Sequence, residues 1–296
     1  MKKYILLMVS TMIFTSCNEN KKEENKTTME NKRPASSGIA VNENHTAFAF
    51  SLTVAESKRL IAKGIAIHPL VKQKLKSGMI IITRGTTNTY IAEELAGLDA
   101  PRGSLVSGNI TPKNTEQVFA GIEKIGEIVL IDGKETDISF KDALEALKKD
   151  DIVFKGGNLL NYEKKQAAVT VGAPDGGTVG RIQPYTSEGP AHLIIPIGLE
   201  KEVFGDLYDY EKFLSEDIKK SGFIPKLIVH KNAEIFTEIE AIKLFGNVEV
   251  IPYASGGIAG SEGAKSFVIY SEPAEIEKVL KIISEIQGET PFIKDI

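Results

Sequence analysis

Short apolar runs alternate with amphipathic segments along most of this chain. Four of the runs are almost free of polar residues, at positions 79–83, 128–131, 152–154 and 192–197. Apolar runs of this length are typical of strands that are buried on both faces of a sheet. The segments between them carry apolar residues at helical spacing, so the pattern predicts an α/β fold in which helices pack on an internal sheet.

The amphipathic segments also carry the boundary signals of helices. Thr53 can cap a helix over residues 54–63, and a second helix follows Gly85. The other helices expected from apolar spacing cover residues 69–76, 116–125, 140–149, 210–220, 234–245 and 274–286. Ser271 is a candidate cap for the last of these helices, and Pro273 suits its first turn because no backbone donor is needed there.

The second half of the chain adds further strands. Residues 167–171 and 179–185 flank the sequence Pro-Asp-Gly-Gly at 174–177, a strong turn signal, and therefore predict a hairpin. Strands are also expected at 226–230, 248–253 and 266–270. Together the elements predict an open, mixed but largely parallel sheet with flanking helices, Rossmann-like, over residues 45–198, and a smaller C-terminal α/β lobe over 199–296.

The first residues of the chain follow a different pattern. Lys2 and Lys3 precede an apolar run over residues 4–14, and Cys17 comes shortly after it. A basic head, a hydrophobic stretch too short to span a bilayer and small residues before a cleavage point are typical of a targeting segment. A buried core helix fits less well, because the residues that follow Cys17 carry charges or amides and cannot continue an apolar face.

This N-terminal segment resembles a bacterial lipoprotein signal. The resemblance implies that residues 1–16 are removed and that Cys17 carries lipid, such as palmitate, which anchors the protein outside the cytoplasm. Asn18 stands where an aspartate would favour the inner membrane, so the outer membrane is expected, and its periplasmic and surface faces both stay open. The polar composition of residues 17–44 predicts a disordered tether.

Charge and composition argue against several functions. A net charge of -4, a pI near 5.8 and the lack of a basic stripe argue against nucleic-acid binding. Cys17 is the only cysteine, so its lipidation would leave no thiol for disulfides or thiolate metal sites. The four histidines lack the paired spacing of metal sites. We therefore expect no metal and no cofactor, and the oligomeric state stays open.

The loop after the first apolar run is the first candidate site. It lies between a strand and a helix, and its candidate ligand-binding residues are Gly85, Thr86, Thr87, Asn88 and Thr89. Amides and hydroxyls gather at such a helix N-terminus, where the helix dipole favours an anion such as phosphate or carboxylate. Alternatively, Thr87 or Asn88 serves only as a helix cap.

Asp132 and Glu135 form the second candidate site, directly after the apolar run at 128–131. Open α/β sheets bind ligands at the edge where their parallel strands end, and two carboxylates there can share proton transfer. A simple Asp-Gly turn explains the same residues equally well.

The third candidate site follows the apolar run at 152–154. Lys155 comes first, Gly156 and Gly157 stand beside it, and Glu163 follows a short segment later. A lysine next to two glycines can approach a substrate oxygen closely, and the glutamate can serve as a general base. Taken alone, such a segment is more often a solvated loop.

The order of the three sites resembles the pattern of type A ribose-5-phosphate isomerase, within the superfamily that also holds glucosamine-6-phosphate deaminase and the coenzyme A transferases. The resemblance covers residues 45–200. It implies that the loop at 85–89 holds a sugar phosphate and that Glu163 moves a proton between adjacent carbons. It also implies that Lys155 and Asp132 steady the enediolate and the sugar hydroxyls.

The expected location bears on the expected function, because sugar phosphates of central metabolism are scarce outside the cytoplasm. Our first expectation is therefore a lipid-anchored protein whose α/β body binds a small anionic or sugar-like ligand. An isomerase-like or transferase-like enzyme is the second expectation, and a structural surface lipoprotein is the third. Whether the chain is an enzyme stays open.

Overall fold

The computed structural model describes residues 38, 40–108, 110–111, 118–216, 218–219 and 221–293. One compact unit spans Asn42–Ile296 and contains all of the buried apolar residues among them. This unit therefore holds the hydrophobic core of the described residues. The signal expected over 1–16, Cys17 and nearly all of the tether expected over 17–44 lie outside the described residues.

A six-stranded sheet, here called the main sheet, has the strand order β10-β8-β5-β2-β3-β4. Its strands are β2 (Met79–Ile82), β3 (Ile128–Ile131), β4 (Lys134–Glu135), β5 (Ile152–Phe154), β8 (His192–Pro196) and β10 (Ala233–Phe236). β2, β5, β8 and β10 run parallel to one another, whereas β3 and β4 pair in the antiparallel sense. The predicted α/β fold with a mixed, largely parallel sheet is confirmed.

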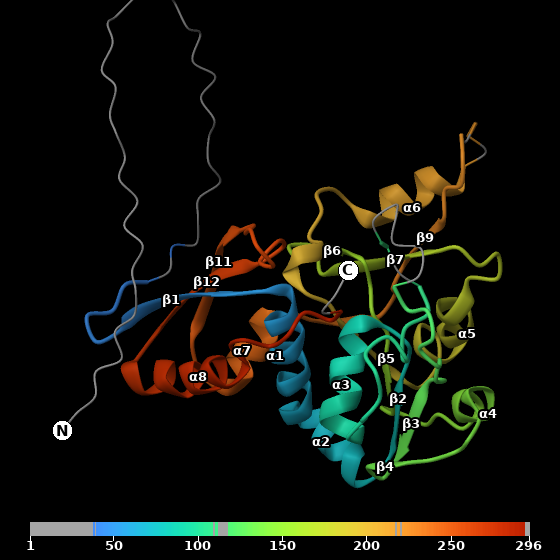
Figure 1. The fold of residues 1–296 in the computed structure, drawn as a ribbon, viewed down its shortest axis with the longest axis horizontal. Coiled ribbons are helices and arrows are strands. Elements are labelled where there is room, and N and C mark those ends of the chain that lie inside the picture. The colour runs from blue at the N-terminus through green and yellow to red at the C-terminus, as the bar shows by residue number, and fades with distance from the viewer. Residues whose placement is uncertain are drawn as a thin grey trace, which may run out of the picture. The chain divides into compact units, whose positions relative to one another are not determined.

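Helices cover both faces of the main sheet (Figure 1). One side carries α1 (Val54–Ile67), α3 (Thr86–Ala96) and α7 (Glu238–Phe245), and the other carries α4 (Phe140–Glu145) and α5 (Gly177–Thr186). Ile80, Ile81 and Val153 are accordingly fully buried. Because neither face meets water, these strands need no polar alternation, which is why they appear in the sequence as continuous apolar runs.

Two smaller antiparallel sheets complete the unit. The first, here called the β1 sheet, contains β1 (Thr46–Leu52), β12 (Lys265–Ser271) and β11 (Glu249–Ser255), with α8 (Pro273–Ile286) packed against it. The second contains β6 (Leu159–Asn161), β7 (Gln166–Val171) and β9 (Lys226–Val229), with α6 (Leu207–Ser215) beside β9. β10 follows position 199 in the chain and pairs with β8, so segments on both sides of that position build the main sheet.

Several helix signals act as predicted. Thr53 caps α1 in a capping box with Glu56, although α1 continues beyond residue 63 to Ile67. Gly97 ends α3 in the left-handed conformation, with φ at 65°. α2 (Pro69–Lys76) has the expected bounds.

The hairpin predicted over residues 167–171 and 179–185 is wrong. β7 occupies the first segment and pairs with β6 and β9, but the second segment belongs to α5. Asp175 Oδ1 accepts a hydrogen bond from the Gly177 amide at 2.9 Å, and Gly176 has φ at 82°. The Pro-Asp-Gly-Gly turn therefore starts a helix, because a turn signal specifies a bend and not the element that follows it.

The helix expected over 234–245 begins instead as strand β10, because pairing with β8 overrides the local helical spacing. Ser271 is not a cap either. Its hydroxyl donates to the Asn247 carbonyl at 2.6 Å, and Glu272 takes the capping position of α8. Pro273 does lie in the first turn of α8, as predicted.

The described part of the helix expected over 116–125, residues 118–125, forms a turn and irregular structure. Gly121 lies in it with φ at 75°, a conformation that interrupts a right-handed helix. β1 has no counterpart among the strands expected from the sequence, because its alternating alanine and phenylalanine residues differ little in polarity.

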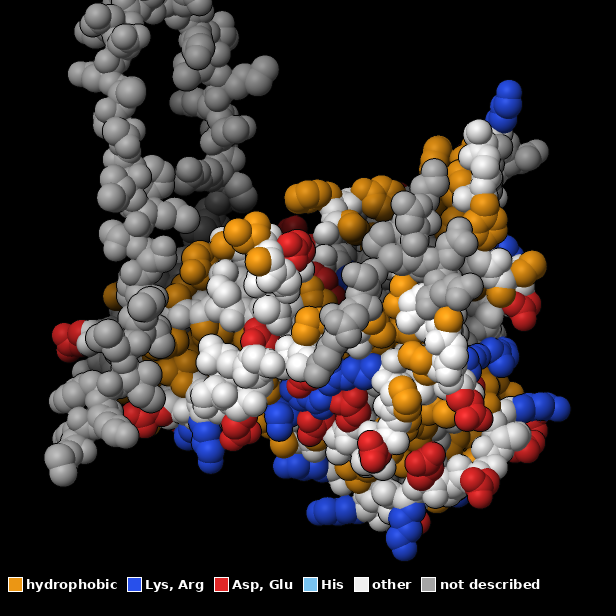
Figure 2. Space-filling view, in the orientation of Figure 1, with side chains coloured by type: hydrophobic (Ala, Val, Ile, Leu, Met, Phe, Trp, Pro, Cys, Tyr) orange, Lys and Arg blue, Asp and Glu red, His pale blue; other side chains and the backbone are white. Residues whose placement is uncertain are grey.

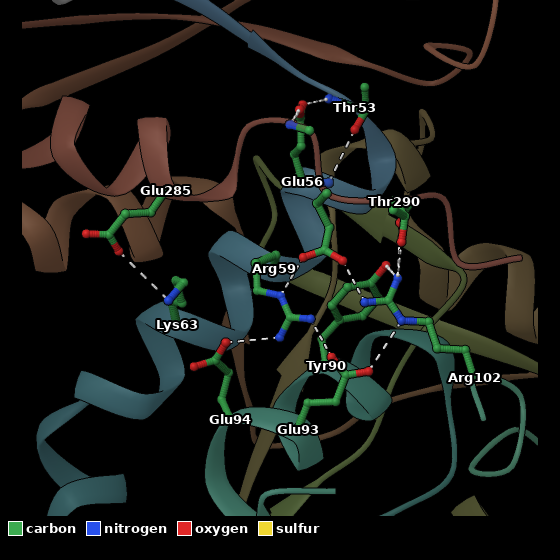
Figure 3. A network of polar contacts seen from close by, with 12 residues as sticks. Thr53, Glu56, Arg59, Lys63, Tyr90, Glu93, Glu94, Arg102, Glu285 and Thr290 are labelled. Atoms are coloured by element: carbon green, nitrogen blue, oxygen red, sulfur yellow. Dashed lines mark hydrogen bonds and ion pairs between the residues drawn. The ribbon is translucent and has the colours of Figure 1, made fainter. Parts of the chain in front are cut away.

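Charged side chains tie α1 and α3 to the C-terminal segment (Figure 3). Arg59 of α1 donates to Glu94 at 3.0 Å and to Glu289 at 2.8 Å, and it also pairs with Glu93. The Arg59 side chain is only 13% exposed. Figure 2 shows basic and acidic side chains lying side by side over this part of the molecule.

The Tyr90 ring contacts both arginines of this network. The guanidinium carbon of Arg59 lies 4.7 Å from the centre of the Tyr90 ring, and that of Arg102 lies 4.4 Å from it. Arg102 also donates to Glu289 at 2.6 Å and to the Tyr90 hydroxyl at 3.1 Å. Each arginine is therefore fixed by carboxylates and by an aromatic ring, which holds the C-terminal segment on α1 and α3.

We predict that Arg59→Met lowers the free energy of unfolding by about 2 to 3 kcal/mol, because it leaves three partly buried carboxylates without one of their cations. Arg181→Met is the matched control, since Arg181 is exposed and lies 5.3 Å from the Phe140 ring. Its cost should stay below about 1 kcal/mol. Urea denaturation of both variants measures the difference, and equal losses would contradict the role given to the network.

Candidate functional site

The parallel strands of the main sheet end at one edge, here called the C-terminal edge. Thr83, Lys155, Ile197 and Thr237 directly follow β2, β5, β8 and β10 there. Open α/β sheets place ligands outside this edge, because the loops that leave it surround a shared space. The candidate site therefore lies among the loops that leave this edge.

The first turn of α3 lies at this edge. The first amides of an α-helix have no acceptor within the helix, and Gly85 at the capping position supplies no side chain to satisfy them. Only two heavy atoms, both of Asn88, come within 4 Å of the place where a Cβ on Gly85 would lie. Amides at a helix N-terminus favour an anion, and here Thr87, Asn88 and Thr89 are themselves buried.

Asn88 connects this turn to two strands. Its Nδ2 donates to the Thr83 carbonyl at 2.8 Å and to the Phe154 carbonyl at 3.2 Å. Asn88 is fully buried, and its Oδ1 has no hydrogen-bond partner among the described residues. Because Phe154 directly precedes Lys155, these bonds hold the first turn of α3 beside that lysine.

Lys155 is the central cation of the site. Its side chain is almost fully buried, and its Nζ donates to the Gly156 carbonyl at 3.0 Å. Burial, followed by the charge of Lys201, lowers the pKa of Lys155 to about 8. Apart from its chain neighbours, no atom lies within 4 Å of the position that a Cβ on Gly156 would take, so the space beside the Gly156 backbone is open.

Two more lysines approach from other elements. Lys58 comes from α1, and Lys201 comes from the 3₁₀ helix η1 (Leu199–Lys201) after β8. Burial and the charge of Lys201 lower the pKa of Lys58 to about 8, against the opposing effect of Glu200. Lys58 Nζ lies 5.9 Å from the centre of the Phe292 ring. The positive charge of Lys201 thus repels those of Lys58 and Lys155 at this edge.

Two glutamates complete the cluster. Glu238, in the first turn of α7, is fully buried and accepts a hydrogen bond from the Leu199 amide at 3.0 Å. Burial, followed by the charge of Glu200, raises the pKa of Glu238. Glu200 Oε2 is buried without a hydrogen-bond partner, and Glu200 Oε1 lies 3.8 Å from Lys201 Nζ. The C-terminal edge therefore combines three lysines with two glutamates. Glu238 has a raised pKa, and Glu200 carries a buried acceptor oxygen without a hydrogen-bond partner among the described residues.

The structure brings two of the three candidate segments together. The loop residues Gly85, Thr86, Thr87, Asn88 and Thr89 lie beside Lys155, Gly156 and Gly157. Gly157 is needed for close packing there, because a Cβ would come within 2.9 Å of the Ala168 carbonyl oxygen.

Asp132 and Glu135 do not join them. β3 runs antiparallel to β2, so its C-terminal end lies beside the beginning of β2. Asp132 Oδ1 accepts a hydrogen bond from the Gly78 amide at 2.8 Å, just before β2 starts. Both acidic residues are therefore at the opposite edge of the main sheet from Lys155.

Among the described residues, no hydrogen bond or ion pair joins Glu163 to Lys155. Glu163 lies in the turn between β6 and β7 and is exposed to solvent. Its neighbour Tyr162 donates to Glu240 at 2.8 Å, which fixes the turn against the first part of α7. The convergence of Lys155, Asp132 and Glu163 that the isomerase resemblance implies is not present in this structure.

The sequence reasoning missed Lys58, Glu200, Lys201 and Glu238. A signal existed for two of them, because the sequence Gly-Leu-Glu-Lys at 198–201 directly follows an apolar strand, as Lys155 does. For Lys58 and Glu238, helical spacing shows which face they share with apolar residues but not which loop they meet.

Comparisons with protein-family models, with curated proteins and with solved structures found no match to this chain. Within the described residues, no group of three or more histidine, cysteine, aspartate or glutamate side chains is placed to hold a metal ion. The physical chemistry of the C-terminal edge is thus the basis for a functional interpretation.

We predict that Glu238→Gln becomes more stable relative to the unchanged protein as the pH rises. In the unfolded chain Glu238 ionises near its ordinary pKa of 4.5, whereas the folded state keeps it protonated to higher pH. Folding thus opposes ionisation, and the folded protein loses stability above pH 4.5 until that raised pKa is passed. Below about pH 4 both states hold the proton and this contribution vanishes.

Chemical denaturation between pH 4 and pH 8 measures this difference. Glu135→Gln is the matched control for the loss of a carboxylate, because Glu135 is exposed and lies at the opposite edge of the main sheet. Parallel stability curves for Glu238→Gln and the unchanged protein would show that Glu238 ionises normally in the folded state.

Proposed function

We propose that this chain is a lipid-anchored extracytoplasmic protein whose α/β body binds a small anionic or sugar-like ligand at the C-terminal edge of the main sheet. The ligand would lie between the first turn of α3 and the lysines that meet there. This proposal concerns binding and assigns no reaction.

One observation carries the proposal: Lys58, Lys155 and Lys201 gather at one edge, and of these three only Lys201 forms an ion pair with a carboxylate among the described residues. Burial, followed by the charge of Lys201, lowers the pKa of Lys58 and of Lys155 to about 8, which is a cost to the folded protein. A bound anion would offset this cost, and the first amides of α3 would add donors on the same side. Clusters of perturbed charges in loops are typical of binding sites.

Two buried acceptors support a ligand that also carries hydroxyl groups. Asn88 Oδ1 and Glu200 Oε2 have no hydrogen-bond partners among the described residues. An unpaired buried acceptor is costly, and a ligand hydroxyl would satisfy it. An acidic sugar or a hydroxy acid combines both properties.

The anchor is supported by the N-terminal sequence. A basic head, an apolar run over 4–14 and the lone Cys17 have the order of a lipoprotein signal. In the described part of the chain, no helix has the length and apolar character required to cross a bilayer. A lipid on Cys17 would hold the compact unit Asn42–Ile296 near a membrane surface.

We predict that the chain from residue 18 onward binds small anions more tightly at pH 7 than at pH 9. A lysine with a pKa of about 8 is roughly 90% charged at pH 7 and roughly 10% charged at pH 9, so affinity should fall about tenfold per participating lysine. Binding at pH 8 should take up protons, because the anion raises the pKa of each lysine. Titration calorimetry with phosphate, citrate and glucuronate as probes tests this.

Two glycine variants distinguish a loss of binding from a loss of folding stability. Gly156→Val should abolish binding while preserving the thermal midpoint, since open space surrounds its Cβ position. Gly38→Val should leave binding unchanged, because its Cβ position is equally open but lies in the chain before the compact unit Asn42–Ile296. Normal anion binding by Gly156→Val, or affinity that does not change with pH, would exclude this edge as the site.

We predict that Cys17→Ser prevents lipid attachment to the full-length chain. Serine has no thiol to accept the acyl chain, so the variant should lose incorporation of labelled palmitate and should leave the detergent phase on extraction. The anion affinity of the body should not change. Equal labelling of both proteins would disprove the anchor without affecting the proposed binding site.

A further inference from the structure

β1 forms an open edge of the β1 sheet. It pairs with β12 over all of Thr46–Leu52, and no strand pairs with its other side among the described residues. The backbone N–H and C=O groups on that side therefore have no strand partner in the described part of the chain. Such an edge is a ready template for another strand.

The opposite edge of the same sheet is protected, and β1 is not. β11 carries Glu249 and Pro252, and its register with β12 shifts between Pro252 and Ala254. Charge, proline and irregularity are the features that prevent strands from pairing at an edge. β1 has the sequence Thr-Ala-Phe-Ala-Phe-Ser-Leu, without charge, proline or a break in register.

The side chains of β1 leave one aromatic ring uncovered. Phe50 and Leu52 are buried on the face that packs against the helices. Phe48 belongs to the same face by strand alternation but is 37% exposed. Ala47 and Ala49 lie on the other face and are exposed. An added strand would thus meet small side chains on one face and could cover Phe48 on the other.

We propose that β1 pairs with β1 of a second copy of this chain, antiparallel and around a two-fold axis at Ala49. This register places Phe48 of each copy opposite Phe50 of the other, and Ala47 opposite Ser51. Phe48 is thereby covered by an aromatic neighbour on the face where Phe50 is already buried. The two three-stranded sheets become one six-stranded sheet.

A second copy fits this edge because β1 is complementary to itself. An antiparallel two-fold arrangement pairs each residue with one from the same strand, so a charged strand would repel its copy, whereas β1 has no charge to repel. At the ends of the strand the same register sets Thr46 opposite Leu52, so no like charges meet within it. The contact lies in the β1 sheet and does not depend on the proposed ligand.

The test uses charges at the position where the two copies meet. The chain from residue 18 onward should show concentration-dependent dimers in analytical ultracentrifugation. Ala49→Lys and Ala49→Glu should each weaken dimerisation at least tenfold, because each variant sets like charges directly across the axis. Mixing the two variants should restore dimers, and native mass spectrometry should identify them as one copy of each.

Ala254→Lys is the matched control, since Ala254 is an exposed alanine on β11 of the same sheet, and this variant should dimerise normally. The thermal midpoint of each variant verifies the fold. Monomers at every concentration would overturn the proposal, as would dimers that resist both Ala49 variants. A mixture of these two variants that stays monomeric would overturn the register around Ala49.

Discussion

The parallel alignment of β2, β5, β8 and β10 is the constraint on which the rest of this structure depends. Parallel strands all end at the same edge, so segments far apart in the sequence release their loops into one space. The first turn of α3, Lys155 and η1 meet there for this reason. The hydrogen bonds from Asn88 to the ends of β2 and β5 then fix their spacing.

Two groups of charged side chains near this edge differ in whether carboxylates compensate their charge. Arg59 and Arg102 are each paired with glutamates and stacked on Tyr90, which gives buried charge the partners that it requires. Within the part of the chain that the structure describes, Lys58 and Lys155 have no carboxylate in an ion pair, and burial lowers the pKa of each. The first group stabilises the packing of α1 and α3, whereas the second costs stability and favours an external anion.

The failures of sequence reasoning have a common cause, which is that long-range pairing is not encoded in local patterns. The apolar runs of β2, β3 and β5 predicted strands correctly, but the run of β3 does not reveal that it lies antiparallel to β2. That direction alone moves Asp132 to the far edge. Similarly, the turn at residues 174–177 was recognised, but α5 follows it because that segment packs on the main sheet.

The sequence by itself determined the α/β class, most strand and helix positions and the glycine-rich loops at the strand ends, because burial and backbone geometry act within a few residues. The order from the basic head to Cys17 is likewise a property of sequence alone. Only the tertiary structure decided which loops share an edge, which lysines repel one another and which strand is left open. These depend on strand direction and on contacts between distant segments, and local periodicity carries no information about either.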